Sequence, residues 1–185
     1  MKHIGTKVIE TRRLILRPFT MEDAQPMFDN WASDPEVTKY LTWPAHGSVE
    51  ITEMVLADWV AGYQRADQYK WAMVLKGGNG EPIGSIDACR VCDDLESAEI
   101  GYCMGRRWWG GGIMAEALTA VVGYLMGQVG MNQVSARHDV SNPNSGRVMQ
   151  KAGMKFEGVL RQSARNNQGI VDMAHYSILK REWLK

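Results

Sequence analysis

The sequence predicts one α/β domain over residues 1–185, with a mixed, largely antiparallel central sheet flanked by helices. Two observations lead to this fold class. Segments with the two-residue period of strands alternate with segments with the 3.6-residue period of helices, and two of the strand-like segments flank a glycine-rich turn typical of an antiparallel hairpin. No repeat, low-complexity tract or linker divides the chain, and 185 residues are enough for one buried core.

The first third of the chain predicts a strand and two helices. The segment TRRLILRPF reads as a strand that stops near Pro18, which cannot donate a ladder hydrogen bond. Thr20 is a candidate N-cap for a helix in TMEDAQPMFDNWAS, and Pro26 predicts that this helix is short or irregular. A second helix begins near Ser48. Its apolar residues recur at helical spacing and are predicted to face the core: Ile51, Met54, Val55, Trp59 and Tyr63.

The rest of the chain alternates strands and helices. KWAMVL and PIGSIDACRV form the predicted hairpin around KGGNGE, and SAEIGYCM is the next strand. An amphipathic helix runs from Met114 to Val129, and Gly130 is placed to end it. QVSARHDV is a predicted strand, and NPNSGRVMQKAG is a short helix closed by Gly153. MKFEGVLR and VDMAHYSIL are the last strands.

Charge and composition exclude several classes of function. The 21 Lys and Arg residues balance the 21 Asp and Glu residues, so no overall field attracts nucleic acid or an anionic membrane. No apolar stretch has the length of a membrane span, and the N-terminal residues lack the apolar core of a signal peptide. We therefore expect a cytoplasmic protein without nucleic-acid or membrane partners. Open edges of the sheet would allow a homodimer.

The cysteines predict neither a disulfide framework nor a metal site. Their count is odd, which fits a reducing compartment: Cys89, Cys92 and Cys103. Cys89 and Cys92 form one C-x-x-C, but strand alternation directs the two thiols to opposite faces, and no second pair completes a zinc site. The four histidines are scattered without metal-binding spacing. No metal is expected.

The segment RRWWGGGIMAEALTAVVGYL, which begins at Arg106, predicts an anion site. Gly110, Gly111 and Gly112 stand at the start of the amphipathic helix. Glycine lets backbone amides approach a ligand closely, and a helix N-terminus adds unpaired N–H groups and a positive dipole end. This combination typically binds phosphate. The alternative is a flexible loop that merely tolerates glycine.

Two nucleotide motifs compete for these glycines. Gly110, Gly112 and Ala115 match the dinucleotide-binding G-x-G-x-x-A between a strand and a helix. However, the five residues from Gly105 to Trp109 intervene, whereas a Rossmann unit turns sharply from strand to glycine. No lysine completes a Walker loop.

Starting one step earlier, Arg107, Gly110 and Gly112 form R-x-x-G-x-G, and here the sequence resembles the GNAT acyltransferase superfamily. In that family a strand ends in a bulge, and a [QR]-x-x-G-x-[GA] loop wraps the pyrophosphate of acetyl-coenzyme A (acetyl-CoA) at the next helix. TRRLILRPF, DPEVTKYL, AEIGYCM, WWGGGIMAEAL, NPNSGRVMQKAGMKFEG and YSILKREW look like the branch that contains ribosomal-protein N-terminal alanine and serine acetyltransferases. The resemblance spans nearly the whole chain.

The resemblance implies a set of cofactor-binding residues that act mainly through backbone N–H groups. They are Met104, Arg107, Trp109, Gly110, Gly111, Gly112, Ile113 and Met114. It further implies that Asn142 bonds the pantetheine arm and that Ser145 lies near the thioester sulfur. Asn-Pro also commonly starts a turn, and Asn144 or Ser145 is a good helix N-cap without any ligand.

The sequence departs from the family pattern at two positions. Gly111 stands where relatives often carry a basic residue, and Cys103 stands where they often carry a bulky aromatic one. Arg106 and Arg107 are candidates to replace the missing charge, although both also suit a solvated surface. Trp108 and Trp109 are predicted to be core anchors beneath the loop, because tryptophan is usually largely buried.

Transfer of an acetyl group to an amine, by direct attack in a ternary complex, requires three roles to be filled. Backbone N–H groups at the end of EIGYCM are candidates to stabilise the oxyanion, and Ser145 is the candidate to protonate the thiolate. Glu99 is the candidate proton acceptor. In an alternating strand, Glu99 is equally able to face solvent or pair with an arginine.

Reference pKa values favour an α-amine as the acceptor. An α-amine titrates at about 7.7–8.0 and a lysine amine near about 10.4, so far more of the α-amine is neutral at pH 7. We expect the acceptor to be a protein N-terminus or a small metabolite. Two other classes stay open: a non-catalytic acyl-CoA-binding sensor of the same fold, and a nicotinamide-dependent oxidoreductase that uses the glycines.

Overall fold

The computed structural model describes residues 1–184, whose eight strands form one sheet in the order β1-β2-β3-β4-β5-β6-β8-β7. The strands are β1 (Ile9–Glu10), β2 (Leu14–Arg17), β3 (Lys70–Leu75), β4 (Pro82–Cys92), β5 (Ser97–Met104), β6 (Gln133–Asp139), β7 (Lys155–Asn166) and β8 (Gly169–Leu179). Neighbouring strands are antiparallel except β5 and β6. The predicted mixed, largely antiparallel sheet is confirmed. Within residues 1–184 its one parallel pair, β5 and β6 with α4 between them, makes a single βαβ unit and not the series of parallel strands of a dinucleotide-binding fold.

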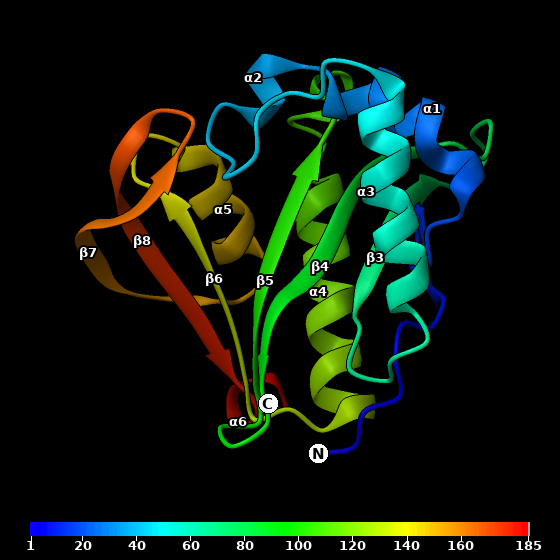
Figure 1. The fold of residues 1–185 in the computed structure, drawn as a ribbon. Helices are drawn as coiled ribbons and strands as arrows, with labels where there is room; N and C mark the ends of the chain where they lie inside the picture. The colour runs from blue at the N-terminus through cyan, green and yellow to red at the C-terminus, as the bar shows by residue number, and fades with distance from the viewer. Residues whose placement is uncertain (185) are drawn as a thin grey trace.

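Helices cover both faces of the sheet (Figure 1). On one face lie α4 (Ile113–Tyr124), its one-turn π-helical continuation η4 (Leu125–Val129) and α5 (Pro143–Lys151), all packed in the main core. Over the other face lie η1 (Met21–Asp23), α1 (Ala24–Met27), η2 (Phe28–Ala32), α2 (Pro35–Thr38) and α3 (Val49–Gly62), with a second, smaller core. The short η3 (Arg106–Trp108) precedes α4, and α6 (Lys180–Trp183) follows β8.

Local sequence signals place most of these elements correctly. β2 ends at Arg17, directly before Pro18, and the helical segment that follows is broken into short 3₁₀, α and π pieces. Glycines with positive φ end α4–η4 and α5, with φ of 90° at Gly130 and 83° at Gly153. These positions favour glycine because a Cβ atom disfavours left-handed backbone.

The predicted core stripe of α3 is wrong in part. Ile51 is 43% exposed and Met54 is 74% exposed. The fully buried residues of α3 are instead Thr52 and Leu56. Thr52 is polar, but its hydroxyl bonds Nδ1 of His46 at 2.8 Å, so its burial leaves no unpaired group. A hydrogen-bonded threonine therefore occupies the core-facing side of α3, where apolar spacing alone predicts Ile51 and Met54.

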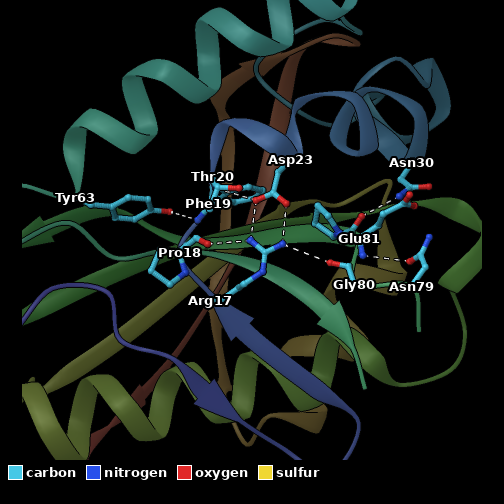
Figure 2. Close-up of polar contacts among 11 residues, drawn as sticks. Arg17, Pro18, Phe19, Thr20, Asp23, Asn30, Tyr63, Asn79, Gly80 and Glu81 are labelled. Atoms are coloured by element: carbon cyan, nitrogen blue, oxygen red, sulfur yellow. Dashed lines mark hydrogen bonds and ion pairs between the residues drawn. The ribbon is translucent and has the colours of Figure 1, made fainter. Parts of the chain in front are cut away.

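A buried ion pair holds the first helical segment to the sheet. The guanidinium of Arg17, at the end of β2, donates two hydrogen bonds of 2.7 Å to the carboxylate of Asp23, which is 4% exposed. Figure 2 shows this guanidinium between Asp23 and the hairpin turn at Gly80. Nearby, the Phe19 amide donates to the hydroxyl of Tyr63 on α3 at 2.9 Å. These contacts fix the helices over the second face.

Gly105 offers a test of how tightly the segment after β5 packs. A Cβ atom there would lie 2.3 Å from the carbonyl oxygen of Asn30 and 2.6 Å from the ring of Trp108. We expect Gly105→Ala to lower the free energy of unfolding by about 1–3 kcal/mol, because the core has no room for it. Gly127→Ala is the matched control, since nothing lies within 4 Å and alanine favours helices. Equal urea midpoints for the two variants would contradict the prediction.

Candidate active site

The site is built around the gap between β5 and β6. These strands pair in parallel only from Ser97 to Ile100, opposite Gln133 to Ala136. Beyond that point β5 stays with β4 and β6 stays with β8, and Figure 1 shows the two strands diverging. Within residues 1–184, the facing edges of Gly101–Met104 and Arg137–Asp139 have no partner strand across the gap. An extended polar ligand can therefore bond to these backbone edges.

The glycine-rich loop lies at the open end of this gap. Gly110 has φ of 81° and Gly112, the N-cap of α4, has φ of 71°. A Cβ atom at Gly110 would meet nothing within 4 Å, so the space beside it is open. Backbone amides at the start of a helix have no carbonyl partner within that helix. Within residues 1–184, the amides of residues 110–115 make no other hydrogen bond either. The arrangement fits an anion such as pyrophosphate.

The side chains of the loop mostly serve packing. Met104, Ile113 and Met114 are buried in the core, so only their backbone atoms can reach a ligand. Trp108 packs partly buried against that core, as expected, but Trp109 is 52% exposed and is not a core anchor. Its indole Nε1 instead donates to the carbonyl of Met104 at 2.7 Å. Trp109 thus ties the end of β5 to the loop.

The two loop arginines have different partners. Nε of Arg106 lies 2.6 Å from Oδ2 of Asp34 at the start of α2. Burial acts to raise the pKa of Asp34, but hydrogen bonds led by that from Arg106 lower it overall. Arg106 therefore forms an ion pair with α2, which uses its Nε. Arg107 lies over the ring of Trp108 and has no acidic partner in residues 1–184, so it remains the available cation.

Arg13, directly before β2, supports the loop, a role that was not predicted from the sequence. Its Nη1 donates to the carbonyl of Gly111 at 2.9 Å, and its Nε donates to Glu116 on α4 at 2.6 Å. The backbone amide of Arg13 and the hydroxyl of Thr11 also donate to Glu116, at 2.8 and 2.6 Å. An acid in the first turn of a helix was the only local signal, and it does not name a partner.

Ser145 contacts Tyr102 rather than capping α5. The N-cap of α5 is Asn142, without a side-chain capping bond, and Ser145 lies inside the first turn. Its Oγ is 2.9 Å from the hydroxyl of Tyr102, which also donates to the Ser145 carbonyl at 3.1 Å. The capping interpretation of Asn144 and Ser145 is therefore wrong. Burial raises the pKa of Tyr102, so its phenol stays protonated at neutral pH.

Glu99 forms an ion pair with Arg137, as the sequence allowed. Its Oε1 lies 2.8 Å from Nε of Arg137 on β6, and its side chain is 20% exposed. Strand alternation places Glu99 on the face opposite Tyr102, which packs against the main core. The structure thus brings Ser145 and Glu99 to opposite sides of the gap.

One further feature borders the site. An open cavity of about 340 Å³ lies beside the first half of α4, lined by Thr11, Ala115, Glu116, Thr119, Ala120 and Lys151. In the part of the chain that the structure describes, no three His, Cys, Asp or Glu side chains gather as a metal-binding group. The same residues include no helix long and apolar enough to cross a membrane.

Comparison with known proteins identifies the family. Residues 13–155 match the model of the acetyltransferase (GNAT) domain. The chain belongs to the GNAT acetyltransferases. It is 32% identical over 173 residues to the uncharacterized N-acetyltransferase YoaA of Bacillus subtilis, covering 94% of this chain and 97% of that one. It is 30% identical over 138 residues to the ribosomal-protein-serine acetyltransferase of Escherichia coli, covering 74% and 75% of the two chains.

A solved structure supports the fold. The microcin C7 self-immunity acetyltransferase MccE, determined in complex with acetyl-CoA and AMP, aligns with a TM-score of 0.82 and 19% identity. The alignment covers 91% of this chain and 93% of that one. The predicted family, fold and N-acetyltransferase class are thereby confirmed for this GNAT protein.

The contact between Arg13 and Glu116 predicts an acid-sensitive loop. Burial acts to raise the pKa of Glu116, but bonds from Thr11 and Arg13 lower it below its ordinary value of 4.5. Its charge therefore stabilises the fold fully above about pH 4.5, and this contribution is lost as the pH falls through the lower folded-state pKa. We expect Glu116→Gln to remove about 1–3 kcal/mol at pH 7 and to flatten the acid limb of the stability profile.

Urea unfolding between pH 3 and pH 7 measures this effect. Glu10→Gln is the matched control, because Glu10 pairs with Lys76 on the surface and is 66% exposed. We expect that control to cost less than about 1 kcal/mol. Parallel stability profiles for wild type and Glu116→Gln would show that the carboxylate does not hold the loop.

Proposed function

We propose that this GNAT protein transfers an acetyl group from acetyl-CoA to a primary amine, by direct attack of the amine in a ternary complex. The observation that supports this most is the position of the open glycine loop at the end of the gap between β5 and β6. The two features suit the two ends of one long ligand, an anionic pyrophosphate and an extended polar arm. The cytoplasm is the proposed location, consistent with three unpaired cysteines.

The donor is proposed to lie along the gap. The amides of Gly110, Gly111 and Gly112 and of the first turn of α4 would bind the pyrophosphate, with Arg107 adding charge. The arm would follow the edge of β5 from Met104 and bond the side-chain amide of Asn142, which makes no capping bond. The complex of MccE with acetyl-CoA and AMP supports this donor, because that protein shares the fold.

Ser145 is the proposed acid for the leaving thiolate. When the amine nitrogen bonds the acetyl carbon, the carbon–sulfur bond breaks and the sulfur requires a proton. The hydroxyl of Tyr102 is 2.9 Å from Ser145 Oγ. If its single hydrogen turns from the Ser145 carbonyl to Oγ, the serine hydrogen is free for the sulfur. Backbone N–H groups at the end of β5 would stabilise the oxyanion.

Glu99 is the proposed acceptor of the amine proton, directly or through water. Its pairing with Arg137 keeps the carboxylate beside the last paired residues of β5 and β6. The face that carries Glu99 is the one opposite Ser145, so acid and base would act on the two sides of the thioester. This separation suits a reaction that takes a proton from one reactant and gives one to the other.

The proposed acceptor is an α-amine, at a protein N-terminus or on a small metabolite. At neutral pH an α-amine needs less help from a base than a lysine does, because its pKa is about 7.7–8.0. The similarity to a ribosomal-protein-serine acetyltransferase favours a protein N-terminus. The segment from Thr38 to Trp43 is held to the turn between β7 and β8, because the side-chain amide of Asn167 donates to the carbonyls of Thr38 and Trp43, each at 2.8 Å.

Calorimetry with acetyl-CoA and with NADH tests the donor. We expect binding of acetyl-CoA alone, and we expect Gly112→Val to abolish it, because valine resists φ of 71° and blocks close approach to the backbone. A thermal melt must show that the variant is folded. Release of free thiol with a panel of amines then tests catalysis. Tight NADH binding without acetyl-CoA binding would refute the donor, and acetyl-CoA binding without turnover would favour a sensor.

Ser145→Ala tests the proposed acid. Because Ser145 does not cap α5, we expect a nearly unchanged thermal midpoint and a kcat lower by about 10²–10⁴, the usual contribution of acid–base catalysis. Ser145→Thr keeps the hydroxyl and should retain more activity than alanine. A folded alanine variant with kcat within about threefold of wild type would exclude the acid role.

A further inference from the structure

The face of the sheet opposite α4 and α5 carries a carboxylate that the mechanism above does not use. Asp87 on β4 is the cross-strand partner of Gly101 on β5, and Gly101 is the first residue of β5 beyond its pairing with β6. A Cβ atom on Gly101 would lie 3.6 Å from Oδ1 of Asp87 and 3.8 Å from Sγ of Cys89. Because Gly101 has no side chain, nothing from that residue separates Asp87 from the gap.

Asp87 is held by a lysine that is itself fixed. Nζ of Lys70 lies 2.8 Å from Oδ2 of Asp87, with the two side chains 12% and 19% exposed. The same Nζ lies 4.1 Å from the ring centroid of Trp59 on α3. An ion pair this buried costs desolvation energy that its attraction often fails to offset, so stability alone is a weak explanation for it.

The second oxygen of Asp87 is available. Oδ1 has no hydrogen-bond partner in residues 1–184, and it is not among their buried unpartnered atoms, so it faces accessible space. Glu99 lies on the same face of β5 as Gly101, because the two are two residues apart in a strand. The Glu99 carbonyl accepts a hydrogen bond from Sγ of Cys89 at 3.2 Å. Desolvation, and then the charges of Asp87 and Glu99, raise the pKa of Cys89 to about 11. The carboxylates of Asp87 and Glu99 therefore both lie near Cys89, beside Gly101.

We propose that Asp87 is the amine-binding residue of this enzyme: Oδ1 accepts a hydrogen bond from the acceptor amine beside Gly101 and directs its nitrogen toward the thioester. Lys70 keeps the carboxylate in place through Oδ2. A charged hydrogen bond of this kind suits a protonated or neutral amine and no anionic acceptor. The inference rests on the proposed function, in which the acetyl end of the donor lies in the gap.

Removing the carboxylate while keeping its shape tests the proposal. With a hexapeptide that has a free N-terminal serine, and with tyramine, we expect Asp87→Asn to raise the acceptor KM at least about tenfold. The KM for acetyl-CoA should stay near its wild-type value. The thermal midpoint should fall, because Lys70 is left without its ion-pair partner, so activity is assayed well below that midpoint. Asp67→Asn is the matched control, because Asp67 forms an exposed pair with Arg65 and should leave all constants unchanged.

Two further variants separate amine binding from a structural role. Lys70→Gln removes the cation that positions Asp87 but keeps the carboxylate, so the acceptor KM should rise less than it does for Asp87→Asn. Gly101→Ala adds a methyl group with ordinary contact distances of 3.6–3.8 Å, so the fold should persist while the acceptor KM rises. Equal increases in KM for Asp87→Asn and Lys70→Gln would mean that only the ion pair matters, and would overturn the proposal.

Calorimetry distinguishes this inference from the proposed function. Tyramine and the peptide are titrated into the enzyme with coenzyme A present. Binding to wild type but not to Asp87→Asn supports the inference even if the peptide is not acetylated, an outcome that would refute only the α-amine acceptor. Absence of binding by both amines, or equal binding to wild type and Asp87→Asn, would overturn it. Failure to bind acetyl-CoA would instead refute the proposed function.

Discussion

The parallel contact between β5 and β6, which ends after Ile100 and Ala136, is the constraint on which the rest of the site depends. Each strand keeps its other neighbour beyond that point, so the gap opens without loss of the outer ladders. The hydroxyls of Tyr102 and Ser145 lie on one side of the gap, and the carboxylates of Asp87 and Glu99 lie on the other. A longer parallel ladder would separate these groups by continuous sheet.

The glycine loop illustrates how a flexible sequence becomes a fixed backbone structure. Glycine loses more conformational freedom on folding than other residues, so such a loop requires support. Here Arg13 bonds the carbonyl of Gly111, Arg106 pairs with Asp34, and Trp109 bonds the end of β5. Side chains of the loop and of Arg13 thus hold the backbone in place, and the amides of residues 110–115 make no hydrogen bond within residues 1–184. An arginine next to the glycines can therefore serve to hold the loop, as Arg106 does through Asp34.

Local chemistry predicted much of the fold and the outline of the site. Strand ends, the glycine-rich hairpin and the helix that follows the loop depend on φ preferences and on hydrogen bonds between near neighbours. The R-x-x-G-x-G motif, formed by Arg107, Gly110 and Gly112, led to the right family. The core face of α3 was misjudged, because the burial of Thr52 depends on a bond to His46 that apolar spacing does not report. Trp109 was misjudged because its indole found a carbonyl partner at the surface.

The sequence by itself determined the order of most strands and helices, the glycine-rich loop at a helix start and the family of the protein. Tertiary structure decided what each polar side chain does. Ser145 contacts a tyrosine 43 positions away, Arg106 pairs with an acid 72 positions away, and Arg13 reaches an acid 103 positions away. Such partners are set by how the strands and helices pack, and periodicity carries no information about them. The role of a buried or half-buried polar group therefore becomes visible only when the sheet has brought its partner to it.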